Sequence, residues 1–297
     1  RNVTWAALMS RVEKISIGGA KFGYDYDYLN NSKILDKNTV CDILKASLSC
    51  GIHTLDTASG YGVSEQVIGD CMHMNNFKKM KIVTKVGHEL DKDFLIEDSL
   101  KKLKIKSVYA ILFHNFKNFK KNPSYYDKLI IKKKEKKIEK IGFSLYFPEE
   151  LEYLLNLDIP LDLVQLPFSI FDKRFESYFS ELKKRGVEIH TRSTFLHGLY
   201  FKKSHQLSAH FNKIKKQLDS LKELSDLYNI DIAAICLKFS LQKKDIDKVI
   251  IGVDNLDILS KNIGFASSAD MSIKISDELS RYSIQDKNIL FPHNWIV

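Results

Sequence analysis

The chain has 297 residues, of which 44% are hydrophobic and 28% are charged, and its formal net charge is +9 at pH 7. A chain of this length can bury a substantial core, and no long linker rich in Pro, Gly or Ser divides it, so we expect one large domain. No uncharged apolar stretch reaches the roughly eighteen residues of a spanning helix, so we expect no such helix.

The start of the chain and its cysteines bear on where the protein works. Residues 1–8, RNVTWAAL, precede Met9 and lack the basic start and apolar centre of a secretory signal. We interpret them as a disordered arm or an expression remnant, and we expect residues 9–297 to form the domain. The four cysteines are Cys41, Cys50, Cys71 and Cys236. They are scattered, with no CxxC pair, which predicts reduced thiols and a cytoplasmic location.

Much of the positive charge lies in residues 117–140, KNFKKNPSYYDKLIIKKKEKKIEK. The apolar residues Leu129, Ile130, Ile131 and Ile138 suggest a buried helical stripe, which makes the lysines the solvated face of a helix. A patch that attracts anionic substrates is the second interpretation. No zinc-finger or RNA-binding aromatic signature accompanies the lysines, so we do not expect a nucleic-acid partner.

Short β-branched runs alternate with segments that have apolar residues at helical spacing. Strands are expected near residues 12–19, 53–58, 81–86, 108–115, 140–145, 163–168, 188–193 and 248–253. Helices are expected over residues 38–51, 64–74, 94–103 and 148–157, among others. This alternation predicts an α/β fold with parallel strands, and eight units favour a closed (β/α)8 TIM barrel. A doubly wound open sheet is the alternative, but GxGxxG is missing after the first strand.

Polar residues stand at the expected carboxyl ends of successive strands, which converge on one mouth in a barrel. These are Asp56, Lys85 and His114, and Tyr61 lies in the loop after Asp56. A nearby ammonium would lower the pKa of a tyrosine from its usual value of about 10, and a carboxylate would keep that ammonium charged. The set therefore predicts a proton relay through Tyr61, with His114 orienting a carbonyl oxygen. Each residue alone also has an ordinary structural explanation.

These residues resemble the catalytic tetrad of the aldo-keto reductase superfamily, which consists of Asp, Tyr, Lys and His. The resemblance is carried by GGAKFG, LDTASGYGVSEQVIG, TKVG, LFHN, IGFSLY, VQLPF and HTRSTFLHG, in this order along the chain. It implies an NAD(P)H-dependent oxidoreductase that reduces a carbonyl. In this reading Tyr61 is the proton donor, Lys85 and Asp56 tune it, and His114 orients the substrate.

The resemblance also implies a cofactor site at the ends of the later strands. Its expected residues are Ser144, Gln165, Arg192, Ser193, Phe195, Gly198, Gly252 and Asn262. Ser144 and Gln165 match positions that hold the nicotinamide carboxamide, although Leu145 stands where an asparagine usually follows. Arg192 replaces a tyrosine that stacks on the nicotinamide ring, and its planar guanidinium could stack in that place. Residues 193–198 would supply backbone donors to the pyrophosphate, and Asn262 aligns with an asparagine near the adenine.

The identity of the cofactor, NADPH or NADH, stays open. Many members grip the adenosine 2′-phosphate with Lys, Ser and Arg, but the matching positions here are Gly252, Val253 and Ile258. A helix N-terminus near Asn255 could still bind a phosphate. The family slightly favours NADP(H).

For the substrate, the motifs resemble a bacterial branch associated with sugar or surface-polysaccharide biosynthesis. This implies a keto or aldehydo sugar derivative, which as an anion would suit the basic surface. Candidate substrate contacts are Phe22 and Tyr24 after the first strand and Trp295 in a C-terminal tail near the barrel mouth. No metal site is expected, because the histidines lack ligand spacing. Two alternatives are a nucleotide-binding sensor with little turnover, similar to potassium-channel β subunits, and a general aldehyde reductase.

Overall fold

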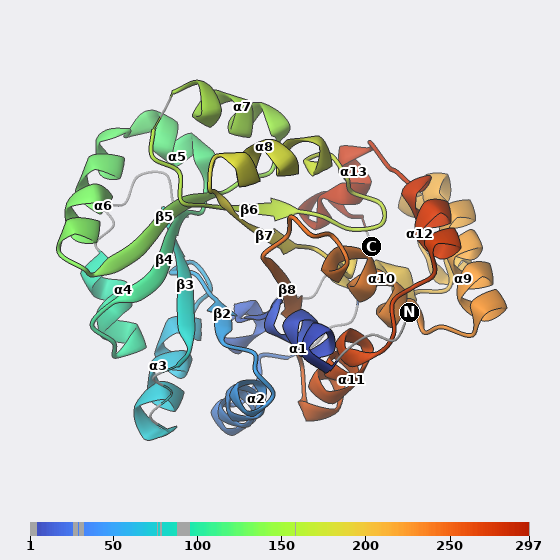
Figure 1. The fold of residues 1–297 in the computed structure, drawn as a ribbon, viewed down its shortest axis with the longest axis horizontal. Helices are drawn as coiled ribbons and strands as arrows, with labels where there is room; N and C mark the ends of the chain where they lie inside the picture. The colour runs from blue at the N-terminus through green and yellow to red at the C-terminus, as the bar shows by residue number, and fades with distance from the viewer. Residues whose placement is uncertain are drawn as a thin grey trace.

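The computed structural model describes residues 5–25, 29, 33–75, 77, 79–87, 96–157 and 159–296. Its parallel strands pair in chain order, and β1 also pairs with β8, which closes the sheet into a barrel (Figure 1). The strands are β1 (Ile15–Gly18), β2 (Thr54–Asp56), β3 (Lys81–Val86), β4 (Val108–Phe113), β5 (Ile138–Ser144), β6 (Leu163–Pro167), β7 (Glu188–Arg192) and β8 (Lys248–Gly252). Each overlaps its predicted segment, so the predicted (β/α)8 barrel is confirmed.

Helices surround the barrel (Figure 1). They are α1 (Trp5–Glu13), α2 (Lys37–Ser49), α3 (Ser64–Asn75), α4 (Ile96–Leu103), α5 (Phe116–Lys121), α6 (Ser124–Lys134), α7 (Pro148–Asn156), α8 (Phe179–Lys184), α9 (Lys215–Tyr228), α10 (Ile232–Leu241), α11 (Leu256–Ser267), α12 (Ile273–Ser280) and α13 (Lys287–Leu290). Short 3₁₀ helices include Ala20–Phe22 and Leu196–Phe201. Helices α2, α3, α4 and α7 occupy the four segments predicted to be helical.

Two packed layers result from the alternation of side chains along each strand. One face of the strands joins the helices in a large apolar core. A separate cluster consists of Val83, Ala110, Leu112 and Leu163, all fully buried. Val83 lies two residues before Lys85 and therefore on the same face of β3, so this cluster lies beneath Lys85 within the barrel.

The lysine-rich segment 117–140 is not one helix. Helix α5 ends at Lys121, α6 begins at Ser124, and Ile138 is the first residue of β5. The break falls at Pro123, which stands at the start of α6, where proline is favoured. Ile131 is 54% exposed, so the predicted apolar stripe is wrong at this position too.

The first described residues are helical, so the prediction of a disordered arm is wrong for Trp5 to Leu8, which belong to α1. Residues 1–4 lie outside the described part of the chain. Arg11 of α1 donates to Asp270 at 2.7 Å and to the Ser268 carbonyl at 3.1 Å, which attaches the helix to the segment between α11 and α12.

The prediction of four reduced thiols is wrong for two of them. Cys41 of α2 and Cys71 of α3 form a disulfide, with Cα atoms 5.1 Å apart. Both are buried on facing sides of adjacent helices, and this separation is within the range that a disulfide requires. Cys50 and Cys236 are free.

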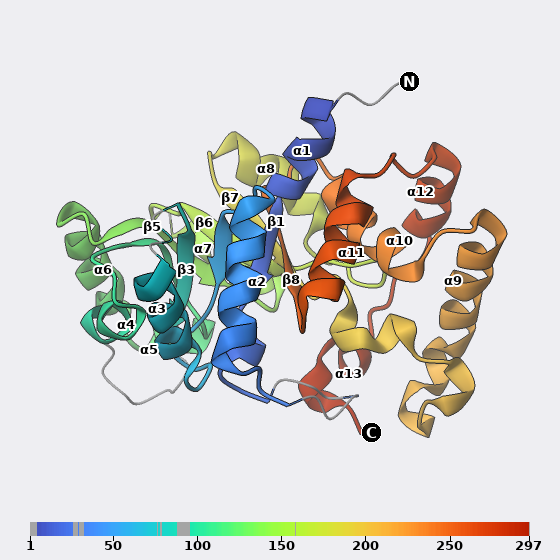
Figure 2. The ribbon, with the colours of Figure 1, turned by 90° about the horizontal axis from the view of Figure 1, so that it is seen from below.

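The C-terminal segment lies at the end of the molecule opposite α1 (Figure 2). Because α1 precedes β1, this places α13 on the side where the strands end.

Among the described residues, no helix is both long and apolar enough to cross a bilayer.

Candidate active site

Asp56, Lys85 and His114 come together because three neighbouring strands end at the same side of the barrel. Asp56 is the last residue of β2, Lys85 lies next to the end of β3, and His114 follows β4 directly. The backbone N–H of His114 donates to the Val86 carbonyl at 2.8 Å, which continues the pairing of β4 with β3 past its last residue. The predicted convergence of these side chains is therefore present in the structure.

Asp56 and Lys85 form a buried ion pair. The Lys85 Nζ lies 2.6 Å from Asp56 Oδ2 and also donates to the Thr57 carbonyl at 3.0 Å. The other Asp56 oxygen accepts from Gln165 Nε2 at 2.6 Å, so both carboxylate oxygens are used. Burial lowers the pKa of the Lys85 ammonium, and the Asp56 carboxylate opposes this shift. The ammonium is thus fixed at a single position.

Lys85 contacts Tyr61 as well as Asp56 and so links the two residues. Lys85 Nζ is 3.4 Å from the Tyr61 hydroxyl and 4.9 Å from the centroid of its ring. The imidazole of His114 meets the Tyr61 ring edge to face, with centroids 5.5 Å apart. The structure therefore brings all four predicted residues together.

Two glycines hold the backbone of the Tyr61 turn against the loop that follows β1. A Cβ on Gly23 would lie 2.4 Å from the Tyr61 carbonyl oxygen and 2.0 Å from the Ser64 nitrogen. Gly62 has φ +54°, and a Cβ there would lie 2.1 Å from the Gly23 carbonyl oxygen. Larger residues at either position would push these loops apart. The glycine after Tyr61 thus has a defined structural role.

The predicted direction of the Tyr61 pKa shift is wrong. Burial raises the pKa of Tyr61 well above 10, and the Asp56 carboxylate adds to the rise, while Arg192 opposes it. Transfer of the phenol into the low-dielectric site penalises the phenolate, and this cost exceeds the opposing effect of the Arg192 charge. The hydroxyl is consequently protonated at neutral pH, as a proton donor must be before it acts.

A cavity of about 490 Å³ runs from Tyr61 and Asp56 to helix α11. Seven of the eight expected cofactor residues line it: Gln165, Arg192, Ser193, Phe195, Gly198, Gly252 and Asn262. Ser144, the eighth, does not line the cavity but is buried at the end of β5, paired in register with Gln165.

The loop after β7 forms one wall of this cavity and has an unusual backbone. Ser193, Leu196, His197 and Gly198 have φ values of 66°, 42°, 50° and 84°. Left-handed conformations at three residues other than glycine are energetically unfavourable. Such geometry is concentrated at binding sites, where the surrounding structure enforces it.

Arg192 does not stand free in the cavity. Its guanidinium carbon lies 4.1 Å from the centroid of the Tyr146 ring, and Nη2 donates to the Leu145 carbonyl at 3.1 Å. Sequence reasoning had assigned Arg192 to the nicotinamide ring and had missed Tyr146. Tyr146 covers one face of the planar Arg192 guanidinium, and the opposite face points away from that ring.

Two lysines at the α11 end of the cavity were also missed. Lys21, in the 3₁₀ helix after β1, forms an ion pair with Asp254 at 2.9 Å. Lys261 lines the cavity from α11, next to Asn262. Asn255 caps this helix by accepting from the Ile258 N–H at 2.9 Å, so that donor is already used. Lys261 therefore supplies positive charge here, whereas the charge of Lys21 is balanced by Asp254. Gly252, Val253 and Ile258 supply no charge.

The three expected substrate contacts differ in their surroundings. Phe22 has no exposed surface and packs in the core, so the prediction that it contacts substrate is wrong. Tyr24 is 44% exposed. Trp295 is buried, donates Nε1 to the Ile289 carbonyl at 2.8 Å, and meets the His197 ring edge on. It supports the cavity wall from behind.

No cluster of His, Cys, Asp or Glu side chains that could hold a metal ion occurs among the described residues.

Comparison with known proteins gives consistent results. The model of the aldo/keto reductase family matches residues 14–281. An uncharacterized oxidoreductase of Bacillus subtilis, YqkF, is 23% identical over 282 residues, which cover 84% of this chain and 90% of that protein. A second uncharacterized oxidoreductase, from Schizosaccharomyces pombe, is 29% identical over 208 residues, covering 66% of this chain and 70% of its own.

Solved structures share the fold. The holo form of an aldo-keto reductase from Bacillus halodurans superposes with a TM-score of 0.74 at 19% identity, covering 93% of this chain and 95% of that one. A protein described as a putative aldo-keto reductase, from Pseudomonas aeruginosa, gives a TM-score of 0.64 at 20% identity, covering 86% of this chain and 89% of its own.

Proposed function

The chain belongs to the aldo/keto reductase family of NAD(P)H-dependent oxidoreductases, and on this premise we propose that it reduces the aldehyde or ketone of a small sugar derivative with Tyr61 as proton donor. The observation that carries the proposal is the contact chain in which Lys85 Nζ lies 2.6 Å from Asp56 and 3.4 Å from the Tyr61 hydroxyl.

The proton step follows from these contacts. Because the raised pKa keeps Tyr61 protonated, its hydroxyl is ready to donate to a carbonyl oxygen that gains negative charge. As the phenolate forms, the ammonium of Lys85 stabilises it, and Asp56 keeps that ammonium in place. His114 stands edge on to Tyr61, where an imidazole N–H can orient the same carbonyl oxygen. The buried cluster around Val83 and Leu112 closes the barrel beneath the site against water.

The residues of the 490 Å³ cavity fit a nicotinamide cofactor, which supplies the hydride when bound. Gln165 lies beside Asp56 at the catalytic end, and the left-handed loop over residues 193–198 can direct backbone N–H groups at a pyrophosphate. Asn262 and Lys261 stand at the far end. We favour NADPH, because Lys261 brings positive charge to the end of the cavity where a 2′-phosphate would be held.

Arg192 supports an anionic substrate. Arg192 lines the same cavity as Tyr61, and its charge opposes the rise in the pKa of Tyr61, so the guanidinium can bind an anion beside the reacting groups. A carboxylated or phosphorylated sugar aldehyde or keto sugar has this chemistry. A cytoplasmic location is part of the same proposal, since such metabolites are made inside cells.

The test is a panel assay of NADPH oxidation by absorbance. Phosphorylated sugar aldehydes and keto sugars are compared with their unphosphorylated counterparts and with simple aromatic aldehydes. We expect the highest kcat/KM for the anionic sugars and no turnover by Lys85→Met. Equal turnover of all aldehydes would instead indicate a general aldehyde reductase. Tight binding of NADPH without turnover of any carbonyl would indicate a nucleotide sensor.

A further inference from the structure

A second and larger cavity, of about 960 Å³, lies at the other end of the barrel from the active site. Its wall includes Lys81, Val108 and Ile138, which are the first residues of β3, β4 and β5. The cavity therefore lies at the side of the barrel where the strands begin, whereas Tyr61 lies at the side where they end. Met72, Phe77 and other apolar side chains complete the wall.

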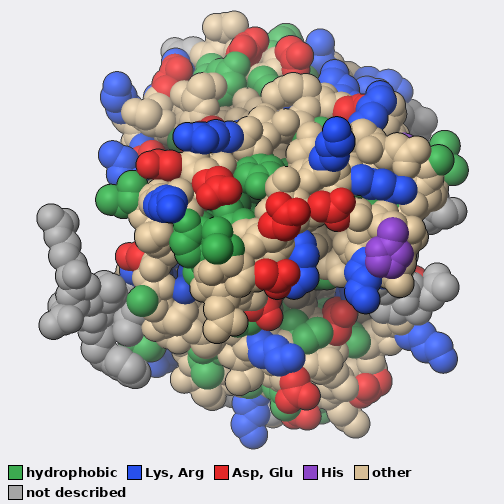
Figure 3. All heavy atoms as spheres, turned by 90° about the vertical axis from the view of Figure 1, so that its right-hand side faces the viewer, with side chains coloured by type: hydrophobic (Ala, Val, Ile, Leu, Met, Phe, Trp, Pro, Cys, Tyr) green, Lys and Arg blue, Asp and Glu red, His purple; other side chains and the backbone are tan. Residues whose placement is uncertain are grey.

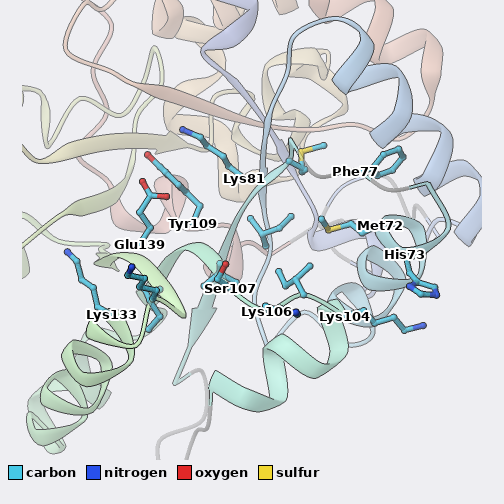
Figure 4. A pocket seen from close by; sticks show the side chains of 16 residues that line it. Met72, His73, Phe77, Lys81, Lys104, Lys106, Ser107, Tyr109, Lys133 and Glu139 are labelled. Carbon is cyan, nitrogen blue, oxygen red and sulfur yellow. The ribbon is translucent and has the colours of Figure 1, made fainter.

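Positive charge dominates this cavity. Of the 16 residues that line it, Lys81, Lys104, Lys106, Lys133 and Lys136 are lysines, and the single carboxylate is Glu139. Figure 4 shows that the lysines it labels come from different elements around the opening. On the face over α9 and α12, by contrast, acidic and basic side chains are interspersed (Figure 3). The lysines of the cavity are partly balanced outside it, where Asp70 contacts Lys104 at 2.7 Å and Asp162 contacts Lys133 at 2.6 Å.

The backbone of Lys104 and Lys136 is the second, independent observation. Both residues follow a helix and have φ values of 55° and 60°, in the left-handed region that favours glycine. Each closes the same helix ending: the N–H of Ile105 donates to the Leu100 carbonyl after α4, and the N–H of Lys137 donates to the Lys132 carbonyl after α6.

In the described part of the chain, this ending occurs at three further helices, each time with glycine or asparagine. Gly51 follows α2, Gly186 follows α8 and Asn229 follows α9, with φ values of 88°, 75° and 49°. The same hydrogen bond from the next residue is present in all three. Lysine thus replaces the favourable residue at two of five equivalent positions, and both of these lysines line the same cavity. A helix C-terminus attracts a cation, but a lysine elsewhere in the last turn would serve equally well without adopting a left-handed backbone. The helix ending therefore does not explain these two lysines.

We propose that this cavity binds a small organic polyphosphate. Lysine ammonium groups are compact charges suited to phosphate oxygens, and their distribution around the opening requires a ligand with several anionic groups. The volume is that of a small-molecule site, and the apolar wall at Phe77 and Met80 accommodates an organic part. This site is separate from the cofactor cavity and does not depend on the proposed reaction.

The helix endings offer a variant that removes charge without breaking the fold. Lys104→Gly/Lys136→Gly replaces each lysine by the residue that its φ angle favours. The control Lys216→Ala/Lys274→Ala removes the same charge from exposed positions on α9 and α12. Tripolyphosphate is titrated calorimetrically into each protein at constant ionic strength, with NADPH present so that the cofactor cavity is filled. We expect the glycine variant to bind at least about tenfold more weakly and the control variant to change by less than about twofold.

Amine acetylation followed by mass spectrometry locates the bound probe. Tripolyphosphate should protect Lys104, Lys106 and Lys136 in the unmodified protein and leave Lys216 reactive. Equal weakening in both double variants, or uniform protection of all lysines, would show a general effect of net charge and would overturn the proposal. So would binding of hexaglutamate without binding of tripolyphosphate, which would indicate an acidic protein partner instead. Failure of NADPH to bind would contradict the proposed function but leave this labelling pattern unchanged.

Discussion

The guanidinium of Arg192 is stacked on the ring of Tyr146, with 4.1 Å between the guanidinium carbon and the ring centroid. Tyr146 is held in turn by the C-terminal segment, because its ring meets Phe291 edge to face at 5.8 Å. The orientation of the Arg192 charge at the end of β7 thus depends on the loop after β5 and on the end of the chain.

We expect Arg192→Met to lower kcat/KM for an anionic carbonyl substrate by about tenfold or more, because a charged hydrogen bond to the substrate is lost. The value for a neutral aldehyde of similar size should fall less. Tyr146→Phe keeps an aromatic face under the guanidinium and serves as the control, with a loss below about threefold. Equal losses for anionic and neutral substrates would show that Arg192 does not select for charge.

The end of the barrel where the strands begin contains a charged network that should make stability depend on pH. Glu188 accepts from Tyr109 at 2.6 Å, contacts His190 Nε2 at 2.7 Å, and pairs with Lys140. Burial alone would raise the pKa of Glu188, but the hydrogen bonds from His190 and Lys140 hold it well below its usual range. Below a pH of about 4, the unfolded chain takes up a proton at this residue before the folded protein does. The stabilisation is therefore complete above that pH and is lost as the pH falls through the folded pKa.

Glu188→Gln should lower the free energy of unfolding at pH 7 by about 3 kcal/mol, because Lys140 loses its partner in a partly buried site. Urea unfolding measured from pH 7 to pH 3 should show a shallower pH dependence for this variant. Tyr109→Phe keeps the carboxylate and should retain the slope of the unmodified protein. Parallel pH profiles for Glu188→Gln and the unmodified protein would contradict this account.

The strain at the two lysine helix endings can be measured directly. We expect Lys104→Gly and Lys136→Gly to leave the free energy of unfolding unchanged or raise it by up to about 1 kcal/mol, since relief of the left-handed strain outweighs the added freedom of the unfolded chain. Gly186→Lys, which creates the same strain after α8, should lower stability by about 1 kcal/mol. A Cβ at Gly186 meets no atom within 4 Å, so only the backbone angle is tested. A clear loss of stability in the glycine variants would mean that the lysines hold the fold.

The Cys41–Cys71 disulfide predicts that protein purified under alkylating conditions has two reactive thiols after denaturation and four after reduction. Cys41→Ser/Cys71→Ser should lower stability by about 3 kcal/mol, because the unfolded chain is no longer cross-linked. Cys50→Ser is the matched control and should have little effect. Four reactive thiols without reductant would contradict the disulfide and restore the prediction of four reduced cysteines.

The barrel and the position of the tetrad could be predicted because both depend on local sequence. Short β-branched runs identify strands, and a polar residue at the end of a run reaches the mouth of a closed parallel barrel. The contacts that were missed join distant parts of the chain. Tyr146 is paired with Arg192, Lys21 with Asp254 and Cys41 with Cys71, and none of these pairs is visible as a sequence spacing. The Tyr61 pKa was predicted in the wrong direction because the effect of Lys85 is evident from residue types, whereas burial is not.

The most direct test of the account compares cofactor binding and turnover in Tyr61→Phe, which removes only the hydroxyl oxygen 3.4 Å from Lys85 Nζ. NADPH affinity is measured by fluorescence titration, and turnover is measured with the best substrate of the panel. Our account predicts a dissociation constant within about twofold of the unmodified protein and a fall in kcat of about a hundredfold or more. Turnover that stays within a few-fold of the unmodified protein would contradict the assignment of Tyr61 as the proton donor.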